Sequence, residues 1–533
     1  MKNFHIAIIG GGVIGSAIAR ELSRYELDII LFEKESDVAS STSKANSGVI
    51  HSGINSPPKS LKAHFCVEGN KIFQSLAEEL SVPVKFTGKY IIARNEEEIK
   101  DLIKLKKNGI ENNVKGLRLI EAEEINSNEP NISSKYALFV PSAGITLPYQ
   151  LTIALAENSI INGVKFLLET KIIDINNINN KYNIKTNNGL FKSDFIINAA
   201  GLNCRDIVQM LEEPDFKVYP CRGEYLVLDK NCNSLIKKLI YPIPQKKYGF
   251  LGIHITPTID GNILLGPTFE YINNINDTKT TKEKMNLILN EVKEIIPSLN
   301  EKAVINAYSG IRCKISPPEY DRISDFRVEN SKINPGLINL LGIESPGLTA
   351  APAIAKEVVK IILKNIDLRK KTKFISRHNS YFKFSNMTNE RKSKMIKANA
   401  SWGRIICRCE NVTEAEVINA LSNPLEAKTL SSVKYRCRVG MGRCQGGFCT
   451  QHIIRIMEEE FNLDRTKIKL KSKKSNVCRS STSVGFFFYR FVFVKMPGTP
   501  HFHRIGSKSV SLCSINDRQP YNIQGQPAQG HSR

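Results

Sequence analysis

The stretch Ile6-Ala7-Ile8-Ile9-Gly10-Gly11-Gly12-Val13-Ile14-Gly15 decides the fold of this chain. An apolar strand leads directly into Gly10-x-Gly12-x-x-Gly15, and the following residues continue with the apolar spacing of a helix. In such a unit the first glycine permits a tight turn, the second lets a pyrophosphate approach the backbone, and the third lets the helix pack closely on the strand. The helix then directs its free N–H groups at the phosphates.

A second predicted strand supports a nucleotide site. The predicted strand spans residues 28–32, of which Ile29 to Phe32 are apolar, and ends at Glu33, which lies 18 residues after Gly15. A carboxylate at this place in the fold meets the ribose hydroxyls of an adenine dinucleotide. The glycines do not distinguish FAD from NAD, and a glycine-rich turn without a ligand is the alternative. The rest of the chain must decide between them.

A Rossmann-like parallel sheet is predicted to continue from these two strands. A loop of small and hydroxyl residues, 40–54, suits close contact with a cofactor. The strand at 195–201 has the continuous apolar character of a strand buried in a parallel sheet. A further strand at 337–342 precedes a helix whose start is marked by Pro346 and Gly347.

Other segments predict a second sheet inserted between these strands. Residues 85–140 and 216–315 contain β-prone runs separated by turn residues, which indicates a mostly antiparallel sheet that caps the first. The expected fold class is α/β, or α+β when both sheets are counted. These two parts together span residues 1–365.

Three further segments complete the chain. Residues 366–400 are basic and lack periodicity, which predicts a linker, and residues 401–463 form a compact module rich in cysteine. Residues 464–533 differ in composition and predict a basic tail that is disordered or non-native, because its apolar residues cannot build a core. The alternative is a membrane-surface anchor formed by the apolar run 485–494.

Charge is concentrated in the linker and the tail. The formal net charge is +23, of which residues 367–400 carry +8 and residues 465–533 carry +12. The remainder of the chain is close to neutral, so no folded basic face is indicated. This distribution argues against nucleic acid as a partner.

The N-terminus and the cysteines indicate a reduced, cytoplasmic setting. The first strand begins within a few residues of Met1, which leaves no room for a signal peptide, and no run of about 18 apolar residues could cross a membrane. The 12 cysteines therefore favour reduced thiols and a metal site over disulfides. We expect a cytoplasmic protein, with any membrane association made through a partner subunit.

Several motifs occur in the order found in one group of flavoproteins. They lie at residues 10–33, 46–54, 60–63, 198–201, 222–225, 251–254, 310–312 and 345–349. On these motifs the chain resembles the FAD-dependent amino-acid oxidase (DAO) superfamily, and within it the L-2-hydroxyglutarate dehydrogenases and the catalytic subunit of anaerobic glycerol-3-phosphate dehydrogenases. The resemblance implies a split, Rossmann-like FAD-binding domain with an inserted substrate-capping domain.

The resemblance also implies which residues contact FAD. They are Gly10, Gly12, Gly15, Glu33, Ser43, Asn46, Ser47, Gly201, Gly347, Leu348 and Thr349. Flavin reduction gives negative charge to the pyrimidine side of the ring, where the helix beginning at Gly347 would direct its positive end. Taken alone, this helix could also be an ordinary capped helix.

His51, His254, Arg222 and Arg312 are the candidate catalytic residues. Oxidation of a hydroxy compound needs a base for the O–H proton while the C–H hydride passes to the flavin, and imidazole suits that task. An arginine fork binds a carboxylate or phosphate with two hydrogen bonds. The resemblance implies that both histidines lie near the flavin. The alternatives are packing histidines and solvated surface arginines.

The cysteine module carries four candidate metal ligands. Cys407-x-Cys409 is followed after 34 residues by Cys444-x4-Cys449, and four thiolates can hold a [2Fe–2S] cluster or a structural zinc. The segment resembles the [2Fe–2S] domain of bacterioferritin-associated ferredoxin, which implies the iron–sulfur cluster. Cys437 is a fifth nearby thiol, and we expect it to be a packing residue.

Together these features predict an FAD-dependent dehydrogenase that oxidises a small anionic hydroxy compound. The combination of flavin and cluster favours glycerol 3-phosphate, with L-2-hydroxyglutarate and an amino acid or amine as alternatives. A cluster beside a flavin favours electron delivery to a second redox subunit, a flavoprotein or a membrane anchor, over delivery to oxygen. An electron-transfer subunit without a substrate pocket is the competing class, and Arg222, Arg312 and His254 argue against it.

Overall fold

A computed structural model describes residues 2–244, 251–317, 325–379, 381–472 and 475–477. All of these residues belong to one compact unit of the chain, Met1–Phe487. The apolar run 485–494 lies outside the described residues. Within the described part of the chain, no helix has both the length and the apolar character required to cross a membrane.

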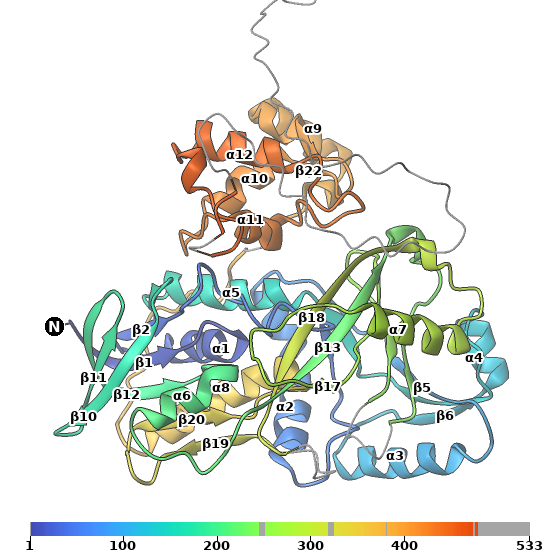
Figure 1. Ribbon diagram of the computed structural model, residues 1–533, viewed down its shortest axis with the longest axis horizontal. Helices are drawn as coiled ribbons and strands as arrows, with labels where there is room; N and C mark the ends of the chain where they lie inside the picture. Colours follow the sequence, from blue (N-terminus) through green and yellow to red (C-terminus); the bar gives the residue numbers. More distant parts are fainter. Residues whose placement is uncertain (1, 245–250, 318–324, 380, 473–474, 478–533) are drawn as a thin grey trace, which may run out of the picture. The chain divides into compact units, whose positions relative to one another are not determined.

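The glycine turn belongs to an eight-stranded sheet with a parallel centre (Figure 1). Across the sheet the strands are β10 (Ile172–Ile178), β11 (Lys181–Thr186), β12 (Gly189–Asn198), β1 (Lys2–Ile9), β2 (Ile29–Phe32) and β9 (Lys165–Leu167), with β20 (Leu337–Leu341) beside β12 and β19 (Arg327–Asn330) beside β20. The strands from β20 through β12, β1 and β2 to β9 are parallel. The predicted Rossmann-like sheet is confirmed.

Both faces of this sheet are covered, which explains why its central strands are apolar without alternation. On one face, Ile6 and Ile8 of β1 pack against helices. These helices are α1 (Val13–Leu22), α2 (Leu61–Glu79), α5 (Pro148–Ile161) and α8 (Gly347–Leu363). On the other face, Ala7 and Ile9 pack with the β10–β12 hairpins and α6 (Cys204–Gln209). A parallel sheet needs such cover on both sides.

The second sheet has nine strands and is mostly antiparallel, as predicted. In order they are β17 (Glu270–Tyr271), β13 (Tyr219–Leu228), β16 (Ile263–Gly266), β15 (His254–Pro257), β14 (Leu239–Pro242), β5 (Lys89–Ala93), β7 (Tyr136–Val140) and β6 (Arg118–Glu121), with β18 (Val304–Lys314) paired to β13. Only the β14–β5 pair is parallel among these pairings of the described strands. The associated helices are α3 (Ile99–Glu111), α4 (Ala122–Asn128) and α7 (Lys282–Ile295).

A small third sheet includes part of the segment that connects β2 with α2. It consists of β3 (Val49–Ile50), β8 (Gly144–Thr146) and β4 (Val84–Lys85). The Gly48 carbonyl also accepts a hydrogen bond from the N–H of Thr146, 2.8 Å away. These contacts hold the loop that carries His51 in place.

The predicted linker, residues 366–400, contains a helix, α9 (Asn389–Ala398). Thr388 caps this helix, since its side chain accepts a hydrogen bond from the N–H of Arg391. None of the α9 residues is buried, so the helix leaves no apolar periodicity for sequence analysis to detect. The segment also packs at the end of α1, where the Phe374 ring centroid lies 5.7 Å from the guanidinium of Arg20 and 4.2 Å from that of Arg24, just beyond the helix.

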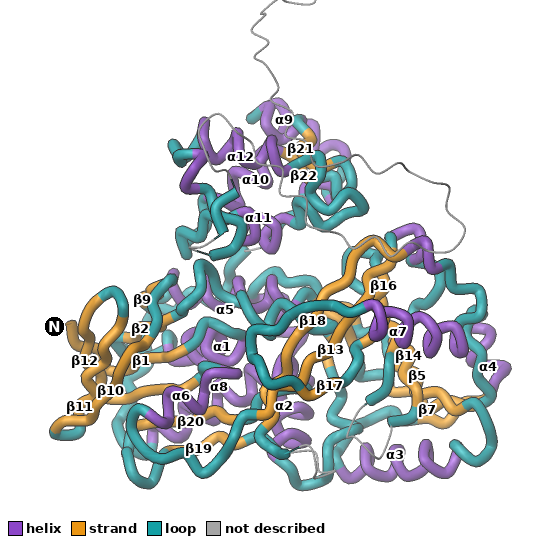
Figure 2. Tube along the Cα trace, viewed as in Figure 1, coloured by secondary structure: helices purple, strands orange, loops and turns teal. Residues whose placement is uncertain are grey.

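Short helices joined by long loops form the cysteine module (Figure 2). The module has its own core. It consists of β21 (Ile405–Cys407), β22 (Val412–Thr413), α10 (Glu414–Leu421), α11 (Leu430–Cys437) and α12 (Thr450–Glu459). Ile468, Leu470 and Val477 also pack on this core, so ordered packing continues past the predicted end at residue 463. Lysines separate these apolar residues, which made the segment resemble the basic tail in composition.

Candidate active site

The turn after β1 forms a cradle in which side chains do not fit. Gly10 has φ +110°, and a Cβ at Gly15 would lie 2.0 Å from the Gly10 carbonyl oxygen. At Gly12 a Cβ would meet only the Ser43 hydroxyl, at 3.2 Å, so space remains beside the first turn of α1. Gly12 provides no side-chain cap, and the N–H of Val13 donates to the Ser43 hydroxyl at 2.9 Å. The first turn of α1 is therefore arranged to receive a phosphate group.

Glu33 lies at the same turn. Its carboxylate accepts hydrogen bonds from the N–H groups of Gly11 at 2.7 Å and Glu35 at 2.9 Å. Burial has the largest effect on this carboxyl and raises its pKa, while the two N–H donors act in the opposite direction. The carboxylate is thus held next to the glycine turn, where a ribose contact is expected from the sequence.

One cavity extends from this turn to the capping sheet. Of the predicted site residues, its wall includes Gly12, Ser43, Asn46, Ser47, His51, Gly201, His254, Arg312, Gly347 and Leu348. Four predicted site residues are not on the wall but contact residues that form it or their chain neighbours: Gly10, Gly15, Glu33 and Thr349. For example, the Thr349 hydroxyl accepts a hydrogen bond from the N–H of His51 at 2.9 Å, which ties the loop to α8.

A second helix N-terminus opens into this cavity. Helix α8 begins at Gly347 after Pro346, which provides no side-chain cap, and both residues line the wall. A helix end of this kind stabilises negative charge close to its first turn. The cavity therefore has one helix N-terminus suited to a pyrophosphate and another suited to a reduced flavin ring.

Arg312 and Arg222 lie on opposite faces of the β13–β18 ladder. Arg312 is paired with Cys221, and both side chains share the cavity face, whereas Arg222 is one residue further along β13 and faces away. The Arg222 guanidinium binds Glu270 at 2.6 Å and Asp277 at 2.9 Å. These carboxylates hold Arg222 away from the cavity wall, so the structure does not support the prediction that Arg222 anchors the substrate.

Arg312, in contrast, keeps its guanidinium available. Its nearest polar contacts are the Thr268 carbonyl oxygen at 3.5 Å and the Cys221 sulfur at 3.7 Å. Among the described residues, no carboxylate forms an ion pair with it. A guanidinium in this position can bind an anionic group of a ligand with two hydrogen bonds.

The two histidines are neutral and lie in the same cavity. The His51 Nε2 atom is 3.3 Å from the Ser345 hydroxyl. The His254 Nδ1 atom lies 3.0 Å from the Gly252 carbonyl oxygen, so this nitrogen carries the proton and Nε2 is left as an acceptor. Burial lowers the pKa of each histidine to about 3. Both imidazoles are therefore unprotonated at neutral pH, and the same burial makes each a weaker base than a free imidazole.

Four charged residues of the cavity wall escaped sequence analysis: Lys62, Lys89, Lys314 and Glu344. The Glu344 carboxylate accepts from the ammonium groups of Lys62 at 2.8 Å and Lys314 at 3.0 Å. Although burial opposes ionisation, the two lysines lower the Glu344 pKa to about 2. Lys314 could have been found, since it is two residues from Arg312 and shares its strand face. Lys89 stands in no recognisable motif.

The four predicted cluster ligands form two contacting pairs. Cys407 interacts with Cys449, and Cys409 interacts with Cys444. A hydrogen bond from the Cys449 thiol, helped by backbone N–H groups, lowers the pKa of Cys407, while the same contact raises the pKa of Cys449. A Cβ at Gly442 would lie 2.3 Å from the Cys409 Cβ, so only glycine lets these two loops approach.

The two thiol pairs match the ligand number of a [2Fe–2S] cluster. In a [2Fe–2S] cluster four thiolates are shared between two irons. Cys437 is buried in the module core, and its thiol donates to the Val433 carbonyl oxygen at 3.3 Å, which is the contact of a packing residue.

Two matches to family models agree with this geometry. Residues 5–361 match the FAD dependent oxidoreductase family, and residues 405–459 match the BFD-like [2Fe-2S] binding domain. The chain belongs to the FAD dependent oxidoreductase family. It is an FAD-dependent oxidoreductase whose cofactors are FAD and a [2Fe–2S] cluster.

Several individual proteins are similar to this oxidoreductase. A glycerol 3-phosphate dehydrogenase of Caloramator mitchellensis is 38% identical over 483 residues, which are 90% of this chain and 99% of the relative. A mitochondrial L-2-hydroxyglutarate dehydrogenase of Arabidopsis thaliana is 32% identical over 67% of this chain and 83% of the relative. The FAD-bound structure of L-alpha-glycerophosphate oxidase from Mycoplasma pneumoniae has a TM-score of 0.67 and 31% identity, covering 72% of this chain and all of that one.

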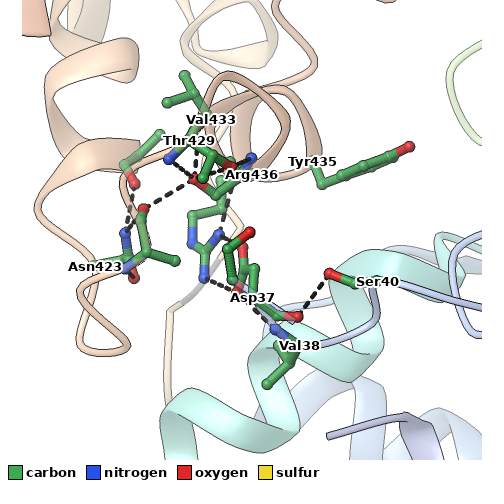
Figure 3. Close-up of polar contacts among 12 residues, drawn as sticks. Asp37, Val38, Ser40, Asn423, Thr429, Val433, Tyr435 and Arg436 are labelled. Carbon is green, nitrogen blue, oxygen red and sulfur yellow. Dashed lines mark hydrogen bonds and ion pairs between the residues drawn. The ribbon is translucent and has the colours of Figure 1, made fainter. Parts of the chain in front are cut away.

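A buried ion triad joins the cluster module to the flavin domain of the oxidoreductase. The Arg436 guanidinium of α11 binds Asp37 at 2.5 Å (Figure 3). It also binds Glu157 of α5 at 3.2 Å, and all three residues are buried. The Asp37 loop reaches the cofactor turn, where the N–H of Ala39 donates to the Gly11 carbonyl oxygen at 3.0 Å. The triad thus connects the module to the segment that forms the FAD cradle.

A second arginine repeats this arrangement next to the cluster cysteines. The Arg438 guanidinium binds Glu410, the residue after Cys409, at 3.0 Å, and Asp260 of the capping part at 2.9 Å. It also donates to the Tyr149 hydroxyl oxygen at 3.0 Å. Arg436 and Arg438 of the module thus each form ion pairs with carboxylates of the flavin domain.

Removing the central arginine of the triad should be strongly destabilising. In an Arg436→Met variant, Asp37 and Glu157 would remain buried without a counter-charge, which typically costs about 3–5 kcal/mol. Urea unfolding of the holoenzyme measures this loss. Arg455→Met is the matched control, since Arg455 is half exposed and lies 3.7 Å from Glu459, and it should change stability by no more than about 0.5 kcal/mol. Equal effects of the two variants would contradict the triad's structural role.

The cluster assignment predicts different outcomes for two cysteines of the module. Cys407→Ser should lose most of the iron and sulfide, because a serine hydroxyl is a poor substitute for a ligand thiolate. Cys437→Ser should keep both, because Cys437 makes only packing contacts. Iron and sulfide analysis of anaerobically purified protein distinguishes the two. Stoichiometric zinc without sulfide in the wild type would overturn the assignment.

Proposed function

We propose that this oxidoreductase is a glycerol-3-phosphate dehydrogenase. The observation that carries the proposal is the cavity itself, which joins the FAD cradle to two neutral histidines and to an arginine without a carboxylate partner among the described residues. Such a site suits a small hydroxy compound with an anionic group. The alignment with the glycerol 3-phosphate dehydrogenase covers 90% of the chain and so includes the cluster module, in contrast to the 67% covered by the Arabidopsis relative.

The residues of the cavity have different roles in the proposed oxidation. Arg312 binds the phosphate with its fork and orients the substrate. His51 or His254 accepts the proton of the hydroxyl group, because each imidazole is unprotonated at neutral pH. FAD supplies the acceptor for the hydride of the C–H bond, and the [2Fe–2S] cluster supplies a one-electron carrier. The product is the corresponding ketone.

We further propose that the electrons leave through the cluster module to a second redox subunit, a flavoprotein or a membrane anchor. One member of each thiol pair is on the outside of the module: Cys409 and Cys444 are exposed, while Cys407 and Cys449 are buried. The Phe448 side chain next to them is also about half exposed. This side of the module offers the surface on which a partner could approach the cluster.

Steady-state assays with an artificial electron acceptor test the substrate. Glycerol 3-phosphate should give a kcat/KM at least about tenfold higher than L-2-hydroxyglutarate, which corresponds to about 1.4 kcal/mol of transition-state discrimination. L-2-hydroxyglutarate is the second candidate because of the Arabidopsis relative, and amino acids or amines are the third. If kcat/KM is higher for L-2-hydroxyglutarate, an amino acid or an amine than for glycerol 3-phosphate, that compound is the substrate instead.

A further inference from the structure

Lys89 contributes an unpaired ammonium group to the cavity wall. It is the first residue of β5 in the capping sheet and is fully buried. Among the described residues, its Nζ atom has no hydrogen-bond partner. The atom lies 4.7 Å from the centroid of the Tyr241 ring, which in turn stacks on the His254 imidazole with 4.0 Å between centroids. Lys89, Tyr241 and His254 thus come from three adjacent strands.

The other two lysines of the cavity differ from Lys89. Lys62 and Lys314 share the carboxylate of Glu344, so their charges are already compensated in part. Lys89 has no such carboxylate within the described residues. A buried charge without a partner is costly, and proteins rarely keep one unless a ligand or metal provides the counter-charge.

The groups around Lys89 carry no negative charge at neutral pH. They are Cys66 of α2, His51, Tyr241 of β14 and His254 of β15. Burial raises the pKa of the Cys66 thiol to about 12, and the histidines are neutral. Burial lowers the pKa of Lys89 to about 8, so its ammonium is still mostly protonated at pH 7. Within the described part of the chain, only the face of the Tyr241 ring partly compensates the Lys89 ammonium, and no anionic group neutralises it.

We propose that Lys89 is a substrate-binding residue that, together with Arg312, selects dianionic hydroxy compounds. Two uncompensated cations on one cavity wall match a substrate with two negative charges, such as a phosphate monoester or a dicarboxylate, and mismatch monoanions such as simple hydroxy acids or amino acids. His254 interacts with both cations and so lies within reach of a substrate that they hold. The inference rests on the proposed oxidation of a hydroxy compound and narrows its substrate class.

The test compares Lys89→Met and Lys89→Gln with the wild-type holoenzyme. With glycerol 3-phosphate, kcat/KM should fall about 100-fold in both variants, because a buried charge pair is lost. With uncharged glycerol at high concentration, the change should be less than about threefold, since no anion is present to pair with Lys89. Inorganic phosphate should raise the Tm of the wild type more than that of either variant, since the variants keep Arg312 but lack the second cation.

A second measurement excludes a merely structural role. Without any anion, both Lys89 variants should have a Tm equal to or above the wild type, because removing an unpaired buried ammonium relieves a cost. Lys62→Met is the matched control and should lower the Tm, because it breaks a buried ion pair. Loss of FAD or a lower Tm in both Lys89 variants would overturn the inference, as would wild-type kcat/KM for glycerol 3-phosphate.

The proposed function can fail separately from this inference. If neither glycerol 3-phosphate nor L-2-hydroxyglutarate is oxidised by the wild type, the substrate proposal is wrong. The phosphate-dependent Tm shift and the Tm of the anion-free variants would still test Lys89 in that case. A phosphate-dependent Tm shift as large in both Lys89 variants as in the wild type would overturn the role of Lys89 whatever the substrate is.

Discussion

The Gly12→Asp variant is expected to be purified as a colourless protein with less than about a tenth of the wild-type FAD content. The new carboxylate would lie at the N-terminus of α1, where the cradle receives a pyrophosphate. Like charges brought together in this way cost several kcal/mol, and each 1.4 kcal/mol corresponds to about a tenfold loss of affinity. Flavin content of the purified protein and reconstitution with added FAD measure the effect.

Gly12→Ala separates the charge from the added volume. Within the protein an alanine Cβ would meet only the Ser43 hydroxyl, at 3.2 Å, but it would also reduce the space for the pyrophosphate. Because it adds volume without charge, Gly12→Ala should retain more FAD than Gly12→Asp. Circular dichroism should show that both variants are folded. An aspartate variant that is folded and fully yellow would contradict the assignment of the pyrophosphate site to Gly12.

The second large effect is expected for Arg312→Lys. The substitution keeps the positive charge but removes the fork, so kcat/KM for the anionic substrate should fall about 100-fold while FAD content stays unchanged. Arg222→Lys is the matched control, because Arg222 lies on the same ladder but is bound by Glu270 and Asp277 on the opposite face. That variant should lose stability and keep kcat/KM within about threefold of the wild type. If Arg222→Lys instead lost about 100-fold in kcat/KM and Arg312→Lys stayed near the wild type, Arg222 would be the anchor.

Local patterns predicted the architecture of this chain well. The run from Ile6 to Gly15 defines a strand, a turn and a helix through spacing alone, and continuous apolar strands indicate a sheet covered on both faces. Cys407, Cys409, Cys444 and Cys449 could likewise be singled out by spacing and resemblance, because ligand cysteines must come together.

Features that depend on long-range packing could not be predicted. A motif that contains Arg222 does not reveal which face of β13 the side chain occupies, since a shift of one residue reverses the face. Lys89 stands alone in an apolar strand, and its importance follows only from neighbours on other strands. The Asp37–Arg436 contact joins residues far apart in sequence, so no local pattern indicates it.

An anaerobic titration with glycerol 3-phosphate tests the central claim most directly. The account predicts that the substrate bleaches the flavin absorbance of the holoenzyme and that an electron paramagnetic resonance signal of a reduced [2Fe–2S] cluster appears in the same sample. L-2-hydroxyglutarate and an amino acid mixture serve as comparisons at equal concentration. A fully loaded enzyme whose flavin remains oxidised with glycerol 3-phosphate, and is bleached by another compound or by none, would contradict the account.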